Sequence, residues 1–352
     1  MRTGIGVGGA ASGQRRDFDE HVDFVVEAEK LGVDFVWTAE AWGQDAIAPL
    51  AYIAARTHRI KLGTGIMQIS ARAPSMTAMT ALTMAAISGD RFVLGLGVSG
   101  PQVVEGLHGA KFEQPLTRMK ETVDIVRLAF KGEKIQYDVK YHKLPLPGGE
   151  GKPLRLSQPP NPAIPIYLAT LAPKPLQYTG AAADGWLGTS FTPENADAHL
   201  AHLRKGAAAA GRDFSKFDVQ VGGTVAFGDD LARLAQPFKA GLAFTLGAMG
   251  SAKTNFYNEA FRRGGWADAA EEVQRLWVAG KRDDAVARVP DEMVLQANLL
   301  GTDALIKERM RKYRDAGVTT LRLAPAGANN AERLATLGRA LDLLKVVNAE
   351  TA

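Results

Sequence analysis

The chain has 352 residues, 46% of them hydrophobic, and its 42 basic and 38 acidic residues give a net charge of +4. These charges are spread along the chain without a block of one sign, which argues against a nucleic-acid or membrane surface as partner. There is no cysteine, which excludes disulfides and thiolate chemistry, and no targeting segment or bilayer-length apolar run is present, so we expect a cytoplasmic protein.

Short apolar runs alternate with segments of helical periodicity from one end of the chain to the other. We expect eight strands, at residues 4–9, 33–38, 60–66, 92–97, 164–170, 185–190, 218–227 and 319–324. We expect helices at residues 17–31, 45–56, 74–88, 116–130, from 173, at 195–211 and at 331–348. In the first helix Asp17 is the expected N-cap, with Glu20 completing a capping box and Gly32 ending the helix.

Two stretches interrupt this alternation. Residues 131–162 are rich in proline and glycine and predict an irregular insertion. Residues 230–316 predict a mostly helical insertion after the seventh strand, and this segment carries several aromatic side chains: Phe244, Phe256, Tyr257, Phe261, Trp266 and Trp277. An aromatic helical segment of this kind suits either a lid over an apolar substrate or packing against a second subunit.

Strict alternation of strand and helix fits either an open doubly wound sheet or a closed barrel. Eight repeats over this length favour an α/β fold with a single (β/α)8 TIM barrel, insertions included, as one domain over residues 1–352. Active sites of such barrels lie at the C-terminal ends of the strands. The residues that follow each strand are therefore the candidates for function.

The pattern G-x-G-x-x-G occurs at residues 4–9 and 95–100. A dinucleotide-binding fingerprint needs a strand before the glycines and a helix opening within them. The first copy leaves no room for that strand, and we expect no helix to open at Gly100, because Pro101 and a glycine-containing loop follow. Small residues in both copies allow close packing of the barrel wall, while Gly97, Val98, Ser99 and Gly100 also let backbone approach a flat or phosphorylated ligand.

Three strand ends resemble the luciferase-like family of flavin and deazaflavin oxidoreductases. They are KLGTGIMQISARAP at residues 61–74, ISGDRFVLGLG at residues 87–97 and AADGW at residues 182–186. Within that family the segments at residues 37–42 and 98–106 are similar to actinobacterial members that use coenzyme F420 rather than FMN. The likeness extends over nearly the whole chain.

The resemblance implies a cofactor site at the strand ends. It places a non-prolyl cis peptide bond at Gly65–Ile66, against the face of the cofactor ring, and the phosphate-bearing tail near the loop that opens the helix at Pro173. The implied cofactor-binding residues are Thr38, Gly65, Ile66, Met67, Gly97, Val98, Ser99, Gly100, Thr170, Leu171, Ala172, Lys174 and Thr189. Many relatives have glycine where this chain has Ala172, and Lys174 is either a phosphate contact or a solvated lysine.

The reacting residues depart from the family pattern. Deazaflavin dehydrogenases of this family usually place Asp-His after the second strand, whereas this chain has Glu40-Ala41, which argues against alcohol oxidation by the histidine route. Glu40 becomes the acid/base candidate, because burial favours the neutral form of a carboxyl group, or else it is hydrogen-bonded to the barrel rim. Trp42 either walls the substrate side of the pocket or packs on the next helix, and His108 either reaches the pocket or lies on the surface.

The leading hypothesis is hydride transfer between coenzyme F420 and a small organic substrate, with the enzyme acting as a reductase. The alternatives are a reduced-FMN-dependent monooxygenase of the same fold and a non-catalytic deazaflavin-binding protein. We expect no metal site, and we interpret His199 and His202 as surface residues without an acidic or cysteine partner. The resemblance also implies a homodimer.

Overall fold

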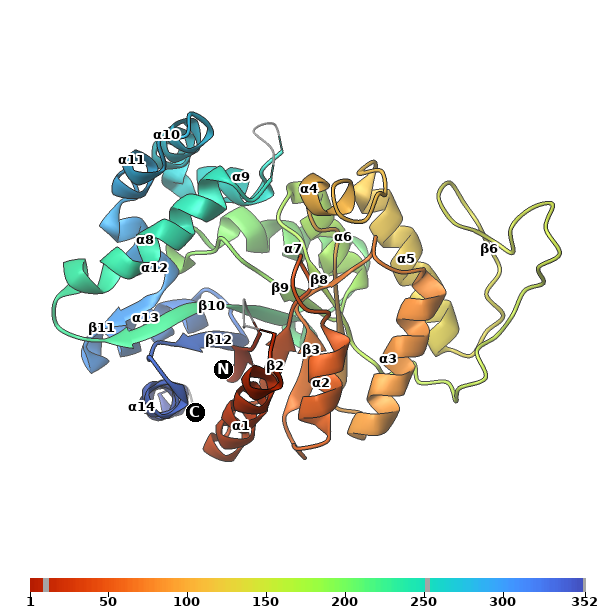
Figure 1. Ribbon diagram of the computed structural model, residues 1–352, viewed down its shortest axis with the longest axis horizontal. Coiled ribbons are helices and arrows are strands. Elements are labelled where there is room, and N and C mark those ends of the chain that lie inside the picture. Colours follow the sequence, from red (N-terminus) through yellow and green to blue (C-terminus); the bar gives the residue numbers. More distant parts are fainter. Residues whose placement is uncertain (9–12, 251–253, 351–352) are drawn as a thin grey trace.

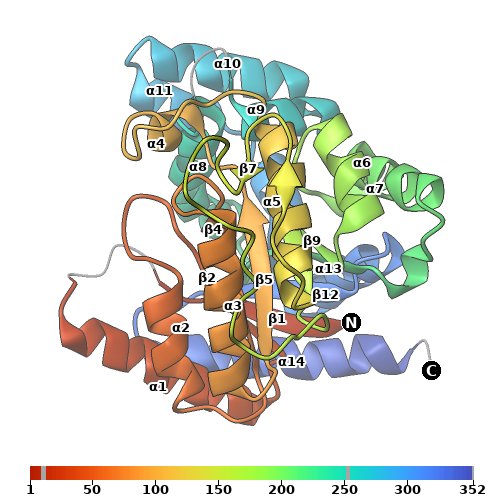
Figure 2. The ribbon, with the colours of Figure 1, turned by 90° about the vertical axis from the view of Figure 1, so that its right-hand side faces the viewer.

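The computed structural model describes residues 1–8, 13–250 and 254–350 (Figures 1 and 2). Eight parallel strands pair in a closed ring, β1-β2-β3-β5-β8-β9-β10-β12, in which β12 returns to β1. These strands are β1 (Arg2–Gly6), β2 (Phe35–Thr38), β3 (Lys61–Thr64), β5 (Phe92–Gly97), β8 (Ile166–Ala169), β9 (Gly185–Leu187), β10 (Asp218–Phe227) and β12 (Thr320–Pro325). The predicted barrel is confirmed; Gly9 of the first glycine pattern lies outside the described residues.

Helices surround this ring. They are α1 (Arg15–Leu31), α2 (Ile47–Ala54), α3 (Pro74–Ser88), α5 (Pro115–Phe130), α6 (Pro173–Ala182), α7 (Asp197–Ala209), α13 (Asp303–Asp315) and α14 (Asn330–Ala349). The main core fills the space between strands and helices, with Ile5, Leu62 and Leu321 among its fully buried members. Burial of these apolar side chains is the main force that holds the two layers together.

The start of α1 differs from the prediction. Gln14 is the N-cap, and Asp17 lies at the third helical position, where its carboxylate accepts a hydrogen bond from the Gln14 backbone N–H. The capping box therefore exists, but it is three residues earlier than expected, because a glutamine takes the cap. Gly32 ends the helix at φ 104°, as expected for a left-handed C-cap.

The barrel interior is packed by a small aromatic cluster. Phe35, Trp37, Tyr167 and neighbouring apolar side chains point inward from alternate strand positions. Gly63 leaves room for the Trp37 ring, since an added Cβ would lie 2.2 Å from it, and Gly95 packs so closely that an added Cβ would lie 1.8 Å from the Thr64 carbonyl oxygen. Glycines of the barrel wall thus permit close packing, which is one of the two interpretations given above for the glycine pattern at residues 95–100.

The insertion after β10 consists of α8 (Leu231–Gly247), α9 (Phe256–Phe261), a π-helical turn (Arg262–Trp266), α10 (Ala267–Val278), α11 (Arg282–Ala287) and α12 (Asp291–Ala297). These elements have a hydrophobic core of their own. In Figure 2, α9, α10, α11 and the short α4 (Pro101–Val104) lie at the end of the barrel toward which the β5 arrow points.

The predicted end of this insertion, residue 316, is wrong. A three-residue strand, β11 (Leu299–Gly301), pairs in parallel with the end of β10. The helix α13 that follows buries Ile306, Met310 and Tyr313 in the main core, so it belongs to the helical layer of the barrel. The insertion therefore ends with α12.

The first insertion, residues 131–162, is irregular as predicted apart from one antiparallel pair. That pair joins β6 (Tyr137–Asp138) to β7 (Lys143–Leu144), and the segment projects from the barrel in Figure 1. A further short strand, β4 (Met67–Gln68), extends the wall beside β5. None of the helices in the described part of the chain is long and apolar enough to span a membrane.

Candidate functional site

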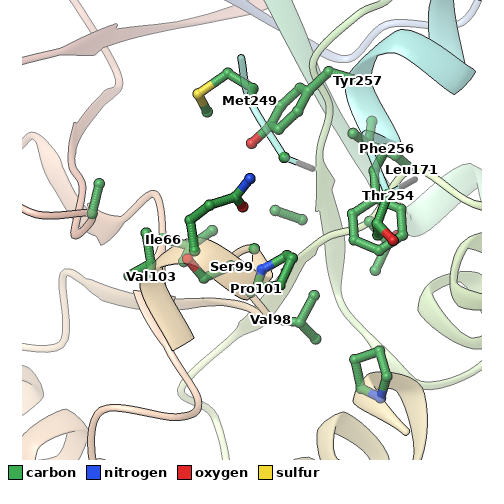
Figure 3. Close-up of a pocket in the computed structure, with 18 of the residues that line it drawn as sticks. Ile66, Val98, Ser99, Pro101, Val103, Leu171, Met249, Thr254, Phe256 and Tyr257 are labelled. Carbon is green, nitrogen blue, oxygen red and sulfur yellow. The ribbon is translucent and has the colours of Figure 1, made fainter. Parts of the chain in front are cut away.

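A cavity of about 370 Å³ lies at the C-terminal ends of β3, β5 and β8, beneath the insertion (Figure 3). This size is within the range of small-molecule sites. Its walls are largely apolar and come from six parts of the chain: Glu40, Ala41 and Trp42; Ile66; Gly97, Val98, Ser99, Gly100, Pro101, Gln102 and Val103; Pro115, Leu116 and Met119; Ala169, Thr170, Leu171, Ala172 and Pro175; and Ala248, Met249, Gly250, Thr254, Phe256 and Tyr257.

One wall is flat. The peptide bond Gly65–Ile66 is cis, as the resemblance implies, and the Ile66 side chain lines the cavity. Gly97 lies directly behind it: a Cβ at that position would be 2.8 Å from Ile66 Cγ1. Because Gly97 has no side chain, the Ile66 side chain can occupy the space next to it; a larger residue at position 97 would displace Ile66.

The loop after β5 continues this wall. Val98, Ser99 and Gly100 line the cavity, and Ser99 has φ 60°, a left-handed conformation that is uncommon for serine. The helical turn α4 opens at Pro101 with Gly100 as its N-cap, which contradicts the expectation that no helix begins there. The turn is only four residues long and the fold is a barrel, so it is not a dinucleotide-binding helix.

The loop after β8 forms the opposite side of the cavity. The Thr170 hydroxyl is paired with Thr179 at 2.8 Å, so it faces α6. Ala172 is the N-cap of α6, but Pro173 and Pro175 lack N–H groups, which leaves few backbone donors for an anion. A cation lies nearby instead: Arg263 Nη2 of the insertion donates to the Leu171 carbonyl oxygen at 2.7 Å.

Five expected cofactor contacts do not line the cavity. Lys174 and Thr189 are exposed outside it. The Thr38 hydroxyl is buried and donates to the Ala46 carbonyl oxygen at 2.7 Å, and Met67 is fully buried in the main core. Thr38 and Met67 thus support the wall from behind, because their side chains point away from the cavity. Gly65 does not line the cavity either, but it forms the cis peptide bond with Ile66, which does.

Glu40 lines the cavity, and its carboxylate is bonded on every side. Arg72 donates to both oxygens, at 2.8 and 2.7 Å, and the backbone N–H groups of Gln68 and Ala46 donate at 3.1 and 3.3 Å. The Glu40 side chain is 6% exposed and that of Arg72 21%. This bidentate pair joins the loops after β2 and β4. Of the two roles expected for Glu40, acid/base or hydrogen-bonded to the barrel rim, the structure has the second arrangement.

Of the two expected substrate contacts, one reaches the cavity. Trp42 lines it and is 63% exposed, so its indole forms part of the cavity edge. His108 is exposed on the loop after α4 and does not line the cavity. The expectation that His108 reaches the pocket is therefore wrong, because the α4 turn carries it outward.

The insertion supplies contacts beyond the expected site residues, and one of them, Tyr257, belongs to the aromatic set expected to form either a lid or a subunit contact. Met249, Thr254 and Tyr257 border the cavity on the side away from Ile66, and the Tyr257 hydroxyl points inward (Figure 3). Burial raises the pKa of Tyr257, so the phenol holds its proton at neutral pH. The aromatic composition of the insertion was the available signal for these contacts.

The histidine pair is not a surface pair. His199 is 1% exposed and lies between Trp186 and Phe191, with ring centroids at 5.3 and 5.9 Å. Burial lowers the pKa of His199 to about 4, which keeps the ring neutral. Among the described residues no group of three or more histidine and acidic side chains could hold a metal ion.

Comparisons with known proteins place this geometry in a family. Residues 2–320 match the family described as luciferase-like monooxygenase. The chain is 38% identical, over 90% of its own length and 94% of the other, to a Mycobacterium tuberculosis protein whose name assigns it to the coenzyme F420-dependent oxidoreductases.

Solved structures share the fold. A coenzyme F420-dependent tetrahydromethanopterin reductase from Methanopyrus kandleri superposes with a TM-score of 0.76 at 22% identity, covering 96% of this chain and 97% of that one. A type II Baeyer-Villiger monooxygenase from Pseudomonas putida in complex with FMN gives 0.69 at 18% identity, covering 96% of each chain. The chain is an enzyme of the luciferase-like monooxygenase family.

Proposed function

We propose that the enzyme binds coenzyme F420 in this cavity and transfers a hydride between the deazaflavin and a small organic substrate, acting as a reductase. The observation that carries the proposal is the flat wall formed by Ile66 over Gly97 and continued by Val98. Apolar groups at neighbouring strand ends can pack against one face of a planar ring system. The 38% identical relative supports the choice of F420.

The residues present fit such a group. Ile66, Gly97 and Val98 would hold one ring face, and the side chains of the insertion would cover the other. The loop Leu171–Ala172, with the Arg263 guanidinium on its carbonyl, would receive the phosphate-bearing tail. When bound, the deazaflavin supplies or accepts a hydride at one ring carbon, while the protein provides orientation, exclusion of water and the proton.

Tyr257 is our candidate for the proton donor. Reduction of a polarised double bond adds a hydride to one atom and a proton to the other, so a donor must face the substrate. The Tyr257 hydroxyl points into the cavity and is neutral at physiological pH, because burial raises its pKa. After donating its proton to the substrate, the phenolate would regain one from solvent.

Glu40 is better suited to positioning than to proton transfer. Each oxygen already accepts one hydrogen bond from Arg72 and one from a backbone N–H group, so the carboxylate is engaged by the protein and not by the cavity. We propose that it fixes the loops after β2 and β4 against the flat wall. Trp42 would then border the substrate space on the same side.

A reduced-FMN-dependent monooxygenase is the second candidate, because the FMN complex of the Pseudomonas putida enzyme shares the fold. The flat wall accommodates either ring. The two functions differ in oxygen consumption, since reduced FMN reacts readily with oxygen and the reduced deazaflavin does so poorly.

The test is turnover with chemically reduced F420. Purified enzyme would be mixed with reduced F420 and a panel of unsaturated carbonyls, imines and ketones, and the absorbance of oxidised F420 followed over time. Substrate-dependent reoxidation supports the proposal. Oxygen uptake that requires reduced FMN, with no turnover of reduced F420, contradicts it. Light scattering on the same sample tests the proposed homodimer.

A further inference from the structure

An arginine lies inside the barrel on β12. Leu321 and Leu323 pack into the main core under the helices, so the alternation of a strand turns Arg322 toward the barrel interior. Its partners in register are Gly4 on β1 and Gly222 on β10. A Cβ at Gly4 would lie 3.5 Å from Arg322 Cγ, so this glycine leaves space for the arginine stem.

The guanidinium has almost no partners. Nη2 donates to the Gly188 carbonyl oxygen at 2.6 Å, whereas Nε is buried and bonded to nothing. Within the described part of the chain, no carboxylate lies within 4.0 Å of it. Burial lowers the pKa of Arg322 to about 10, which still leaves it charged at neutral pH.

Two other charged side chains, Arg91 and Asp218, have the partners that Arg322 lacks. Arg91, which is half-buried, donates from Nε and both terminal nitrogens to Ser88, Thr57 and other oxygens, so its guanidinium is fully bonded. The acid of the barrel interior, Asp218, is already engaged by Arg2 and by several hydroxyl groups. It is therefore not the counter-ion of Arg322.

The barrel is open on the C-terminal side of Arg322. The next inward positions toward the C-terminal end are Gly6 on β1 and Ala324 on β12, and both are exposed. A Cβ at Gly6 would have no atom of the described residues within 4 Å, so the described part of the chain leaves this space open. In the ring of strands β12 stands opposite β5, whose end carries the flat wall at Gly97, so Arg322 lies across the mouth from that wall.

We propose that Arg322 binds an anionic group, a carboxylate or phosphate, of the substrate. The inference rests on the proposed function and names the substrate class: small organic acids or phosphate esters. The free N–H groups of a guanidinium match two oxygens of either anion, and an unpaired buried cation gains the counter-ion that it lacks. With the ring against the wall at Gly97, a substrate between ring and β12 would direct its anionic end to Arg322.

The test uses the full chain, with and without oxidised F420, and inorganic phosphate and acetate as probes against chloride at equal ionic strength. We expect saturable stabilisation of the wild type by one of the two probes; phosphate alone would indicate a phosphate ester, and acetate alone an organic acid. Arg322→Met should weaken that binding at least tenfold. Arg322→Lys should retain part of it, and Arg288→Met, an exposed control, should retain all of it.

Two results would overturn the proposal. One is equal anion binding by wild type and Arg322→Met. The other is unchanged anion binding with a large loss of F420 affinity in Arg322→Met, which would assign the guanidinium to the cofactor. Failure of the wild type to bind F420 at all would refute the proposed function separately, and anion binding by the chain without cofactor would still test Arg322.

Discussion

Replacing Glu40 with glutamine separates the two roles that this residue can have. The carboxylate accepts four hydrogen bonds, two from Arg72 and one each from the Gln68 and Ala46 N–H groups. Glutamine keeps one oxygen and places an NH₂ group where the other oxygen accepted bonds. The change therefore removes the negative charge and sets donors against donors in a largely buried position.

The size of the effect follows from the burial of the pair. Removing one partner of a fully buried ion pair costs about 3–5 kcal/mol. Because the Arg72 side chain is 21% exposed, solvent screening reduces the expected loss to about 2–3 kcal/mol. For a chain of this length that corresponds to a fall in Tm of about 3–4 °C.

The assay is denaturant and thermal unfolding of Glu40→Gln, Arg72→Met and the double variant. We expect the double variant to recover part of the loss, because it no longer leaves one charge uncompensated. Glu133→Gln is the matched control, since Glu133 is an exposed acid 3.9 Å from Lys131, and it should change stability by less than about 0.5 kcal/mol.

The pH dependence of turnover completes the test. If Glu40 positions the loops, Glu40→Gln lowers activity and cofactor affinity but keeps the shape of the pH–rate profile. A variant as stable as the wild type that loses one limb of that profile would refute the reasoning and make Glu40 the acid or base.

Three further predictions come from single positions. Gly97→Ala should weaken F420 binding by up to about 150-fold, because the new methyl group displaces Ile66 at an overpacking cost of about 1–3 kcal/mol, and any part of that cost borne by the free protein lowers Tm instead. Unchanged affinity in a fluorescence titration would contradict the flat-wall account. Tyr257→Phe should lower kcat by about 10²-fold or more while F420 affinity is retained, as judged by steady-state kinetics and titration, and a normal kcat would remove Tyr257 as proton donor. His199 has a pKa of about 4 in the folded protein, below its unfolded value of 6.5. Its neutral form therefore contributes fully to the free energy of unfolding above pH 6.5, and this contribution, on the order of 3 kcal/mol in all, is lost as the pH falls toward 4. In denaturant unfolding at pH 7.5 and pH 5, His199→Leu should reduce the difference in free energy of unfolding between the two pH values, and an unchanged difference would count against this account.

The strands of the barrel could be predicted because each is an apolar run bounded by turn residues and buried on both faces. The strand β11 could not, since three residues, Leu299–Gly301, are too few to show a period. Without it, α13 could not be distinguished from the helices of the insertion. The expected boundary at residue 316 followed from that omission.

The sequence could predict those site residues whose place in the cavity follows from their position at the end of a strand. Ile66 and Gly97 follow strands, and the ends of parallel strands meet at one end of a barrel. Arg263 could not be placed, and Tyr257 could be named only as one of six aromatic residues of the insertion, because tertiary packing decides which face of an inserted helix covers the mouth. Arg322 did leave a signal, since a cation within a buried strand requires either a partner or a ligand.

The central claim is that the cavity holds a deazaflavin rather than FMN. The most direct test is titration of the purified chain with coenzyme F420 and, separately, with FMN, following the fluorescence of each. The account predicts saturable binding of F420, weakened in Gly97→Ala, and much weaker binding of FMN. Selective binding of FMN would contradict it in favour of the monooxygenase, and binding of neither would refute the cofactor site at Ile66 and Gly97.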